Sequence, residues 1–240
     1  KIEQEIAAAK ERVARETREA DAKTRKLSAE ADVAQEALTQ ARYATRNMER
    51  AEQEILSEDK FNGRFYFNAP IGEQSARSCM NRLSFWHKLD PVCDMEIVFN
   101  SPGGQVIDGL ALYDFIQEMK RKGHKVTTKA LGMAASMGGI LLQAGTDRVM
   151  AKESYLLIHE VSTLAIGKIG EIEDEVKFVK MIQERVLHIF AEGCSRAHEA
   201  DPLVHNKPLT VAQLKKGWLR KDWWIDSDEA LRHGLVDRIE

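Results

Sequence analysis

The composition of the chain changes abruptly near residue 60, and this break separates two kinds of structure. The first glycine of the 240-residue sequence is Gly63, and the first proline is Pro70. Before them Ala, Glu, Arg, Lys and Gln dominate, and these residue types favour the α-helix. We therefore expect a helical, coiled-coil-like extension over residues 1–60 and a separate domain over residues 61–240.

Apolar or small residues of the extension recur at alternating spacings of four and three, which is the seam of a coiled coil. The seam positions are Ile2, Ile6, Ala9 and Val13, and then Leu27, Ala31, Ala34, Leu38, Ala41 and Met48, with the polar Thr45 at the one position between the last two. The register is weak in between, because Glu16 and Lys23 occupy the seam. A continuous helix over residues 1–57 would be about 85 Å long and could not bury this seam alone. We expect it to pack against another copy of the chain, another protein or the following domain.

In residues 61–240, short apolar runs alternate with amphipathic stretches of helical period. The predicted strands are 64–71, 95–100, 125–131, 148–151, 155–159 and 223–225, and the predicted helices are 75–89, 106–121, 140–144, 169–198 and 227–233. A loop with one short helix is expected over 201–217, because this stretch holds two prolines and a glycine. Alternation of this kind indicates an α/β fold with a largely parallel sheet.

Charge and composition exclude several classes of function. The net charge is −3, so no basic footprint for nucleic acid is present. No stretch approaches the ~20 apolar residues of a membrane span. Three cysteines without a CxxC pair predict a reducing compartment and neither a metal site nor a disulfide framework. We expect a cytoplasmic location.

The stretch from Gly132 to Gly139 surrounds Ser136 with small residues between a strand-like and a helix-like run. A serine at such a junction can expose its hydroxyl, and the unpaired N–H groups of the next helix can bind developing negative charge. A capping serine with glycines for close packing explains the same residues. On this stretch alone, a nucleophile and a helix cap remain equally open.

A serine nucleophile needs a base and an orienting acid. His159 is the candidate base, because it ends the apolar run 155–158, where a parallel sheet presents its carboxyl edge. A packing histidine is the alternative, and His205 is the strongest competitor among the others. Asp222 is the candidate acid, although Asp226 and Asp228 are equal to it on chemistry alone.

Two backbone N–H groups are expected to stabilise an oxyanion. One would come from the loop at Gly103-Gly104, which follows a buried strand. The other would be the N–H of Met137, the residue after the candidate nucleophile.

Four segments together resemble the proteolytic subunit of the Clp protease (the ClpP family). They are Asn100-Ser101-Pro102-Gly103-Gly104, Ala134-Ala135-Ser136-Met137-Gly138, Leu157-Ile158-His159, and the stretch 222–237 that begins Asp222-Trp223-Trp224-Ile225. Their order matches that of the family, and they are spread over roughly residues 64–239. The resemblance selects Asp222 over Asp226.

The resemblance implies a serine endopeptidase with the triad Ser136, His159 and Asp222, and with the N–H groups of Gly104 and Met137 as oxyanion hole. It further implies a ClpP/crotonase-like spiral of βαβ units. The helix 169–198 would be the handle at which two rings meet. The segment Ile166, Gly167, Lys168 and Ile169 would belong to a strand that binds extended polypeptide substrates.

By the same resemblance, the chain would form a homo-oligomeric ring, usually stacked in pairs, with no cofactor or metal of its own. ATP would enter only through a partner AAA+ unfoldase. The extension over 1–60 and the long loop over 201–217 depart from the family pattern and put standard unfoldase docking in doubt. Phage head-maturation proteases carry similar motifs, so a prohead with capsid or scaffold partners is an alternative setting to the bacterial cytoplasm.

Two other functions remain open from the sequence. A catalytically silent ClpP-like subunit would act in assembly or as a scaffold through residues 1–60. An enzyme of the crotonase-like fold would act on acyl thioesters, where two backbone N–H groups suffice and a triad is unnecessary.

Overall fold

The computed structural model describes residues 63–163, 165–219 and 221–240, together with eleven residues between 10 and 42. The chain divides into two units, Lys1–Phe61 and Asn62–Glu240. The eleven described residues of the first unit are helical. The predicted coiled-coil seam lies otherwise outside the described residues, so both it and the predicted partner for it stay predictions.

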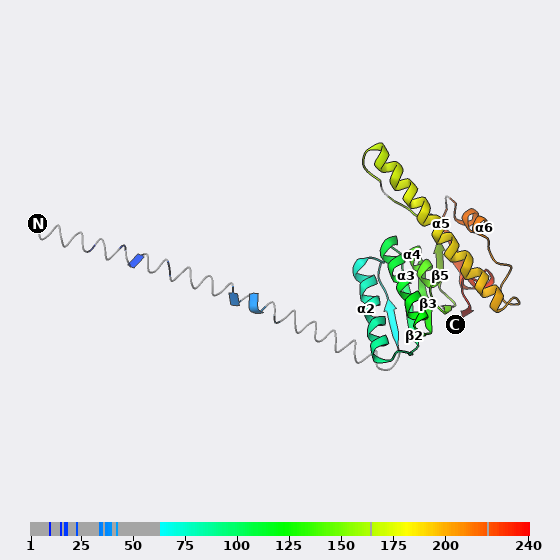
Figure 1. Cartoon of the computed structure of the whole chain (residues 1–240), viewed down its shortest axis with the longest axis horizontal. Coiled ribbons are helices and arrows are strands. Elements are labelled where there is room, and N and C mark those ends of the chain that lie inside the picture. Colours follow the sequence, from blue (N-terminus) through cyan, green and yellow to red (C-terminus); the bar gives the residue numbers. More distant parts are fainter. Residues whose placement is uncertain are drawn as a thin grey trace, which may run out of the picture. The chain divides into compact units, whose positions relative to one another are not determined.

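The second unit is built from alternating strands and helices, which confirms the predicted α/β class (Figure 1). Its strands are β1 (Arg64–Phe67), β2 (Met95–Ser101), β3 (Val126–Ala135), β4 (Asp147–Met150), β5 (Tyr155–Ile158), β6 (Trp223–Asp226) and β7 (Arg238–Ile239). Its helices are α2 (Glu73–Leu89), α3 (Val106–Arg121), α4 (Met137–Leu142), α5 (Ile169–Ala200), α6 (Val211–Trp218) and α7 (Ser227–Arg232).

Strand β3 is the centre of the sheet. It pairs with β2 along one edge, and along the other it pairs first with β4 and then with β5, all in parallel. Strand β1 extends the sheet beyond β2, β7 extends it beyond β4, and β6 pairs antiparallel with β5. The sheet is thus largely parallel, as predicted.

Strand β3 is longer than the predicted strand 125–131. The regular apolar pattern stops at Gly132, but Met133, Ala134 and Ala135 continue the ladder by pairing with Tyr155, Leu156 and Leu157 of β5. Sequence periodicity cannot report such pairing, because small residues give little hydrophobic signal. These last three residues of β3 continue the strand up to Ser136.

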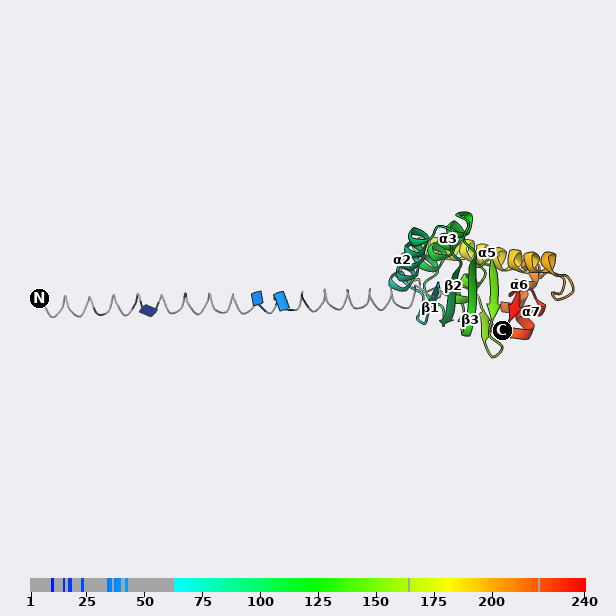
Figure 2. The ribbon, with the colours of Figure 1, turned by 90° about the horizontal axis from the view of Figure 1, so that it is seen from below.

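Helices α2, α3 and α5 lie along one side of strands β1, β2 and β3 (Figure 2). Strand β2 is buried on both faces, since Ile97, Val98 and Phe99 are at most 3% exposed. Continuous apolar runs of this kind are typical of parallel strands in the interior of a sheet. The core therefore sits between the sheet and these helices.

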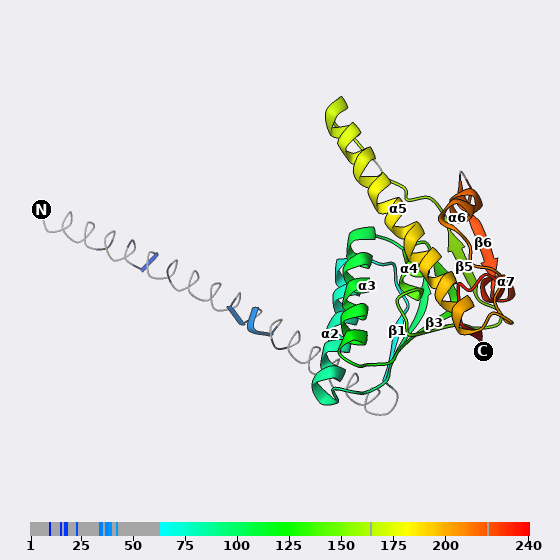
Figure 3. The ribbon, with the colours of Figure 1, turned by 45° about the vertical axis from the view of Figure 1, so that its right-hand side comes forward.

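Helix α5 extends beyond the rest of the unit at its N-terminal end (Figure 3). All of its buried residues lie from Ile182 onward. Its first half instead exposes apolar side chains, among them Ile169 at 79% and Met181 at 70%. A helix with an exposed apolar stripe is typical of a surface that another molecule covers.

Arg148 and Asp237 join β4 to the segment before β7. The Arg148 side chain is fully buried, and its Nε and Nη2 donate to the two carboxylate oxygens of Asp237 at 3.1 and 2.6 Å. Burial alone would raise the pKa of Asp237, but hydrogen bonds and charge from Arg148 outweigh it and hold this pKa below its ordinary 3.8. The pair anchors the C-terminal segment in the core.

In the described part of the chain, no helix combines the length and the apolar character needed to cross a bilayer.

Candidate active site

Ser136 joins β3 to α4 in a backbone conformation that few residues other than glycine adopt. Its φ is +55° and its ψ is −122°, and no other described non-glycine residue has a positive φ. Its N–H donates to the carbonyl oxygen of Leu157 in β5 at 2.9 Å. Such a conformation costs about 1–3 kcal/mol and persists where the surrounding structure imposes it. The turn therefore fixes the position of the Ser136 Cβ, from which the hydroxyl group projects.

The loop at Gly103 and Gly104 packs against this turn. Gly103 has φ +94°, and a Cβ built on it would lie 2.6 Å from the Ser136 Cβ and 2.7 Å from the Ala135 carbonyl oxygen. Gly104 has φ +151°, and a Cβ there would lie 2.1 Å from the carbonyl oxygen of Ile71. Only glycine allows the backbone to approach this closely in this conformation. The glycine pair thus lets the loop lie against the Ser136 turn on one side and against Ile71 on the other.

The N–H groups predicted to form an oxyanion hole have no competing partner. Within the described residues, neither the N–H of Gly104 nor that of Met137 donates a hydrogen bond. Met137 is the first residue of α4, where an N–H has no intrahelical acceptor. Both donors are therefore available to an anion that forms on a bound ligand.

Four of the five predicted catalytic positions line one cavity of about 60 Å³, namely Ser136, His159, Gly104 and Met137. The other lining residues are Val106, Ile140, Ile158, Glu160, Val161, Ser162, Val186, Phe190 and Trp218. The cavity thus combines a serine, a histidine and two backbone donors with a mostly apolar wall.

Asp222 is absent from this lining, and its side chain is exposed. The register of β5 and β6 nevertheless brings it near His159. The last pair of this antiparallel ladder is Ile158 with Trp223, so the next step along the same register sets His159 opposite Asp222. Among the described residues, however, no hydrogen bond links Ser136, His159 and Asp222. In apo structures catalytic hydrogen bonds are often long or open.

The competing acids and the competing histidine have other partners. Asp226 caps α7, since its Oδ1 accepts from the Glu229 N–H at 2.7 Å. Both carboxylate oxygens of Asp228 accept from Lys152 Nζ at 2.7 Å. His205 is buried, and its Nδ1 lies 2.7 Å from the Leu231 carbonyl oxygen, away from the cavity lining. These contacts leave Asp222 as the acid with the fewest other roles.

Cations surround the C-terminal end of α4. Lys120 Nζ donates to the Ala144 carbonyl oxygen at 3.0 Å, and Arg196 Nη2 donates to that of Gly145 at 3.1 Å. Burial and the nearby Arg196 lower the pKa of Lys120 to about 8. Cations at this end favour the helix dipole, whose positive end is at Met137.

The predicted substrate strand is not brought to the cavity. Ile166, Gly167, Lys168 and Ile169 are exposed, and none of them lines the cavity at Ser136. Residues 161–163 and 165–168 form neither strand nor helix. Ile166 instead lines a separate cavity of about 250 Å³ with residues at the start of α5. A substrate-binding role for this segment stays a prediction.

The sequence analysis missed the apolar wall of the cavity. Val186 and Phe190 come from α5, Ile140 comes from α4, and Trp218 comes from the end of α6. Each reads as an ordinary core residue, since only tertiary packing brings these helices together. Nothing in their spacing could have assigned them to the site.

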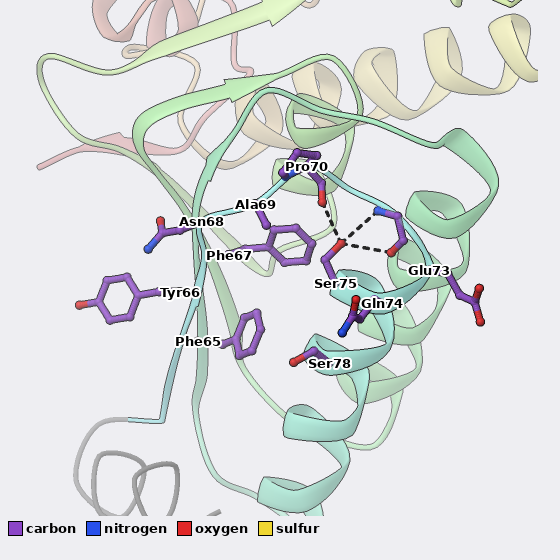
Figure 4. A pocket seen from close by; sticks show the side chains of 11 residues that line it. Phe65, Tyr66, Phe67, Asn68, Ala69, Pro70, Glu73, Gln74, Ser75 and Ser78 are labelled. Atoms are coloured by element: carbon purple, nitrogen blue, oxygen red, sulfur yellow. Dashed lines mark hydrogen bonds between the residues drawn. The ribbon is translucent and has the colours of Figure 1, made fainter. Parts of the chain in front are cut away.

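A larger cavity of about 630 Å³ lies between β1 and the start of α2 (Figure 4). Phe65 and Phe67 point towards α2, while Tyr66 points to the other side of the strand. Ser75 closes the turn before the helix, because its Oγ donates to the Pro70 carbonyl oxygen at 2.8 Å. This cavity contains none of the predicted catalytic residues.

Within the described residues, no group of three or more His, Cys, Asp and Glu side chains could hold a metal ion.

Serine hydrolases are the class that sets a nucleophile on a strained strand-to-helix turn beside unpaired N–H groups. The fold and the cavity of this chain have the features of that class. A narrower assignment comes from comparison of the sequence with known families. The family model described as Clp protease matches residues 49–240. The chain belongs to the Clp protease family, which confirms the family resemblance predicted from the sequence. Membership implies a peptidase of the serine type.

Proposed function

We propose that the chain is a serine endopeptidase that cleaves polypeptides with the triad Ser136, His159 and Asp222. The observation that carries the proposal is the strained Ser136 in one cavity with His159 and the N–H groups of Gly104 and Met137. Backbone strain at a polar residue within a cavity is typical of a functional site.

Each residue has a definite part in this reaction. The Ser136 hydroxyl attacks the scissile carbonyl carbon while His159 accepts its proton. His159 then returns the proton to the amine that leaves, and water repeats the sequence to release the acyl group. Asp222 holds the imidazole in the tautomer that can accept from Ser136. The β5–β6 register supports this pairing.

The oxyanion of the tetrahedral intermediate would accept from Gly104 and Met137. Removal of one such donor typically costs about 3 kcal/mol of transition-state stabilisation. The unpaired state of both N–H groups supports this role.

We further propose that copies of the chain form rings stacked through α5, with the active sites inside. The apolar side chains of Ile169, Ile172 and Val176 recur at three and four along the exposed half of this helix. Such spacing produces one apolar face. A cytoplasmic location, a partner AAA+ ATPase and a prohead setting belong to the same proposal and rest on the family alone.

Hydrolysis of casein and of short fluorogenic peptides tests the activity. We expect the full chain to cleave them and Ser136→Ala to lose at least about 1000-fold in kcat/KM, as removal of a serine nucleophile does. Ser162→Ala is the matched control, because Ser162 lines the same cavity, and it should retain activity. Equal activity of Ser136→Ala and the wild type would refute the assignment.

A catalytically silent subunit is the second candidate, and the exposed Asp222 without a bond to His159 favours it. Such a chain would assemble normally but cleave neither peptides nor casein, even with an ATPase partner. The same assay, run on assembled material of verified mass, separates the two candidates.

A further inference from the structure

The cavity beside Ser136 is closed by apolar side chains from four helices. They are Val106 of α3, Met137 and Ile140 of α4, Val186 and Phe190 of α5, and Trp218 of α6. Phe190 and Met137 are 1% exposed, and Trp218 is fully buried. The part of the wall that these side chains form favours an apolar group over a charged one.

The volume of the cavity sets a limit on what can enter. It measures about 60 Å³, less than half the volume of an engineered closed apolar cavity of ~150 Å³ that binds benzene. We therefore expect methyl and isopropyl groups to fit this space better than an aromatic ring. A longer group would have to displace close-packed side chains, which is itself destabilising.

The geometry of attack decides which substrate group meets this wall. When Ser136 holds the acyl carbon and the carbonyl oxygen points to Gly104 and Met137, only one Cα separates that carbon from the side chain of the same residue. The side chain that precedes the scissile bond, the P1 side chain, must therefore occupy the space next to Ser136. The cavity that Ser136 lines is that space.

Trp218 is the bulkiest part of the wall, and the helix that carries it, α6, is fixed through three residues that precede it. Leu214, one turn earlier in α6, is fully buried. Lys215 Nζ bonds the Glu184 carboxylate of α5 at 2.8 Å. Gly217 lies against the Trp223 ring of β6, which a Cβ would meet at 2.6 Å. The indole therefore cannot move aside at low cost.

We propose that Trp218 limits the P1 residue of the substrate to small apolar side chains, from alanine to valine in size. The proposal rests on the peptidase function proposed above and specifies its substrate class. It depends on the volume of the indole ring and not on its N–H. The Trp218 indole N–H has no acceptor among the described residues, but the same holds for Trp86 of α2, which lies outside the cavity.

The test is kcat/KM of the full chain for four peptides that differ only at P1, with alanine, valine, leucine or phenylalanine. Misfit of single methylene groups in apolar pockets changes kcat/KM by about 10- to 200-fold. We expect the alanine and valine peptides to exceed the phenylalanine peptide by at least about 100-fold. Trp218→Leu should raise kcat/KM for the phenylalanine peptide at least about 10-fold without raising it for alanine.

Trp86→Leu is the matched control, because it removes an equally buried indole elsewhere and should leave the preference unchanged. If Trp218→Leu does not fold, Trp218→Phe removes less volume and should shift the preference in the same direction. Efficient cleavage of the phenylalanine peptide by the wild type, or an equal change for all four peptides in the Trp218 variants, would overturn the proposal.

The outcomes also separate this proposal from the proposed function. Cleavage with the wrong P1 preference refutes the role of Trp218 and leaves the peptidase standing. Absence of cleavage of all four peptides by the wild type, together with absence of a covalent adduct on Ser136 from a small fluorophosphonate, refutes both.

Discussion

The backbone of Ser136 is held at φ +55° and ψ −122°, a region open to glycine and costly for other residues. Replacement by glycine should relieve this strain, whereas replacement by alanine should keep it. We expect Ser136→Gly to be more stable than Ser136→Ala by about 1 kcal/mol, with both variants inactive. Urea denaturation compares the two. Equal stability would mean that the turn is not strained.

Gly103 is the second residue on which the site depends, because any side chain there would collide with the Ser136 turn. We expect Gly103→Ala to lower peptide hydrolysis by at least about 100-fold, since small displacements of a catalytic group cost this much. Gly123→Ala is the control. Gly123 has a similar φ of +99° but no atom within 4 Å of its added Cβ. The Gly123→Ala variant should therefore keep its peptide hydrolysis. If both variants lost peptide hydrolysis equally, backbone strain would explain the loss without a collision at the Ser136 turn.

At this scale the sequence indicated candidate residues by their type but did not predict their geometry. Ser136, His159 and the glycine pair could be singled out because nucleophile, base and close-approach residues have distinctive types and positions. Trp218 and Phe190 could not, because burial in a cavity wall and burial in a core look alike in a sequence. The conformation of Ser136 was also beyond prediction, since it results from β3, β5 and α4 acting together.

The pairing of elements β5 and β6 governs whether Asp222 can reach His159. We expect Asp222→Asn to lower kcat by orders of magnitude, about 10⁴-fold where the acid fully fixes the tautomer. Asp226→Asn is the matched variant, because Asp226 ends β6, the strand that follows Asp222 directly, but caps α7. It should leave kcat nearly unchanged and lower stability slightly. A larger loss of kcat in Asp226→Asn would transfer the role of acid to that residue.

The link between β4 and the C-terminal segment depends on Arg148 and Asp237. Because Arg148 is fully buried, Asp237→Asn would leave its charge without a partner and should cost about 3 kcal/mol at neutral pH. Asp228→Asn, which breaks an exposed pair with Lys152, should change stability little. Denaturation at pH 7 measures both, and a small loss in Asp237→Asn would contradict an anchoring role.

The same pair predicts a dependence on pH. The folded state lowers the pKa of Asp237 below its ordinary 3.8, so the carboxylate stabilises the fold above this pH. The contribution is lost as the pH falls through the lowered value. The difference in stability between wild type and Asp237→Asn should therefore narrow below pH 3.8. A constant difference down to pH 2 would argue against the charge interaction.

Among the elements, those with strong periodicity were predicted closely. Helix α3 has the predicted bounds, because its apolar period is regular and Gly123 ends it. Strand β3 was predicted too short, because its last residues are small and owe their place to β5. Helix α6 was anticipated only as one short helix in a loop, since the prolines before it weaken the pattern.

For the molecule as a whole, the exposed apolar stripe of α5 is the surface on which assembly would depend. We expect Ile172→Glu to reduce the mass of the assembled protein by light scattering, as a single ring would have half the mass of a stacked pair. The reason is that a carboxylate in an apolar contact is costly to bury. Glu173→Gln, on the neighbouring exposed position, should keep the mass. An unchanged mass in Ile172→Glu would exclude this surface.

The α/β class could be predicted from alternation alone, whereas ring formation rests on the family and on the stripe. The part played by residues 1–60 depends on a partner for a thin, alanine-rich seam. A seam of this kind predicts that the helix packs against a partner, but it does not identify the partner's surface.

The central claim is that Ser136 is a nucleophile activated by His159. Treatment with a fluorophosphonate, followed by mass spectrometry of the digested protein, locates the reactive serine directly. We predict one adduct, on the peptide that contains Ser136, which is lost in Ser136→Ala and forms far more slowly in His159→Ala. An adduct that persists in Ser136→Ala, or one that forms equally fast without His159, would contradict the account.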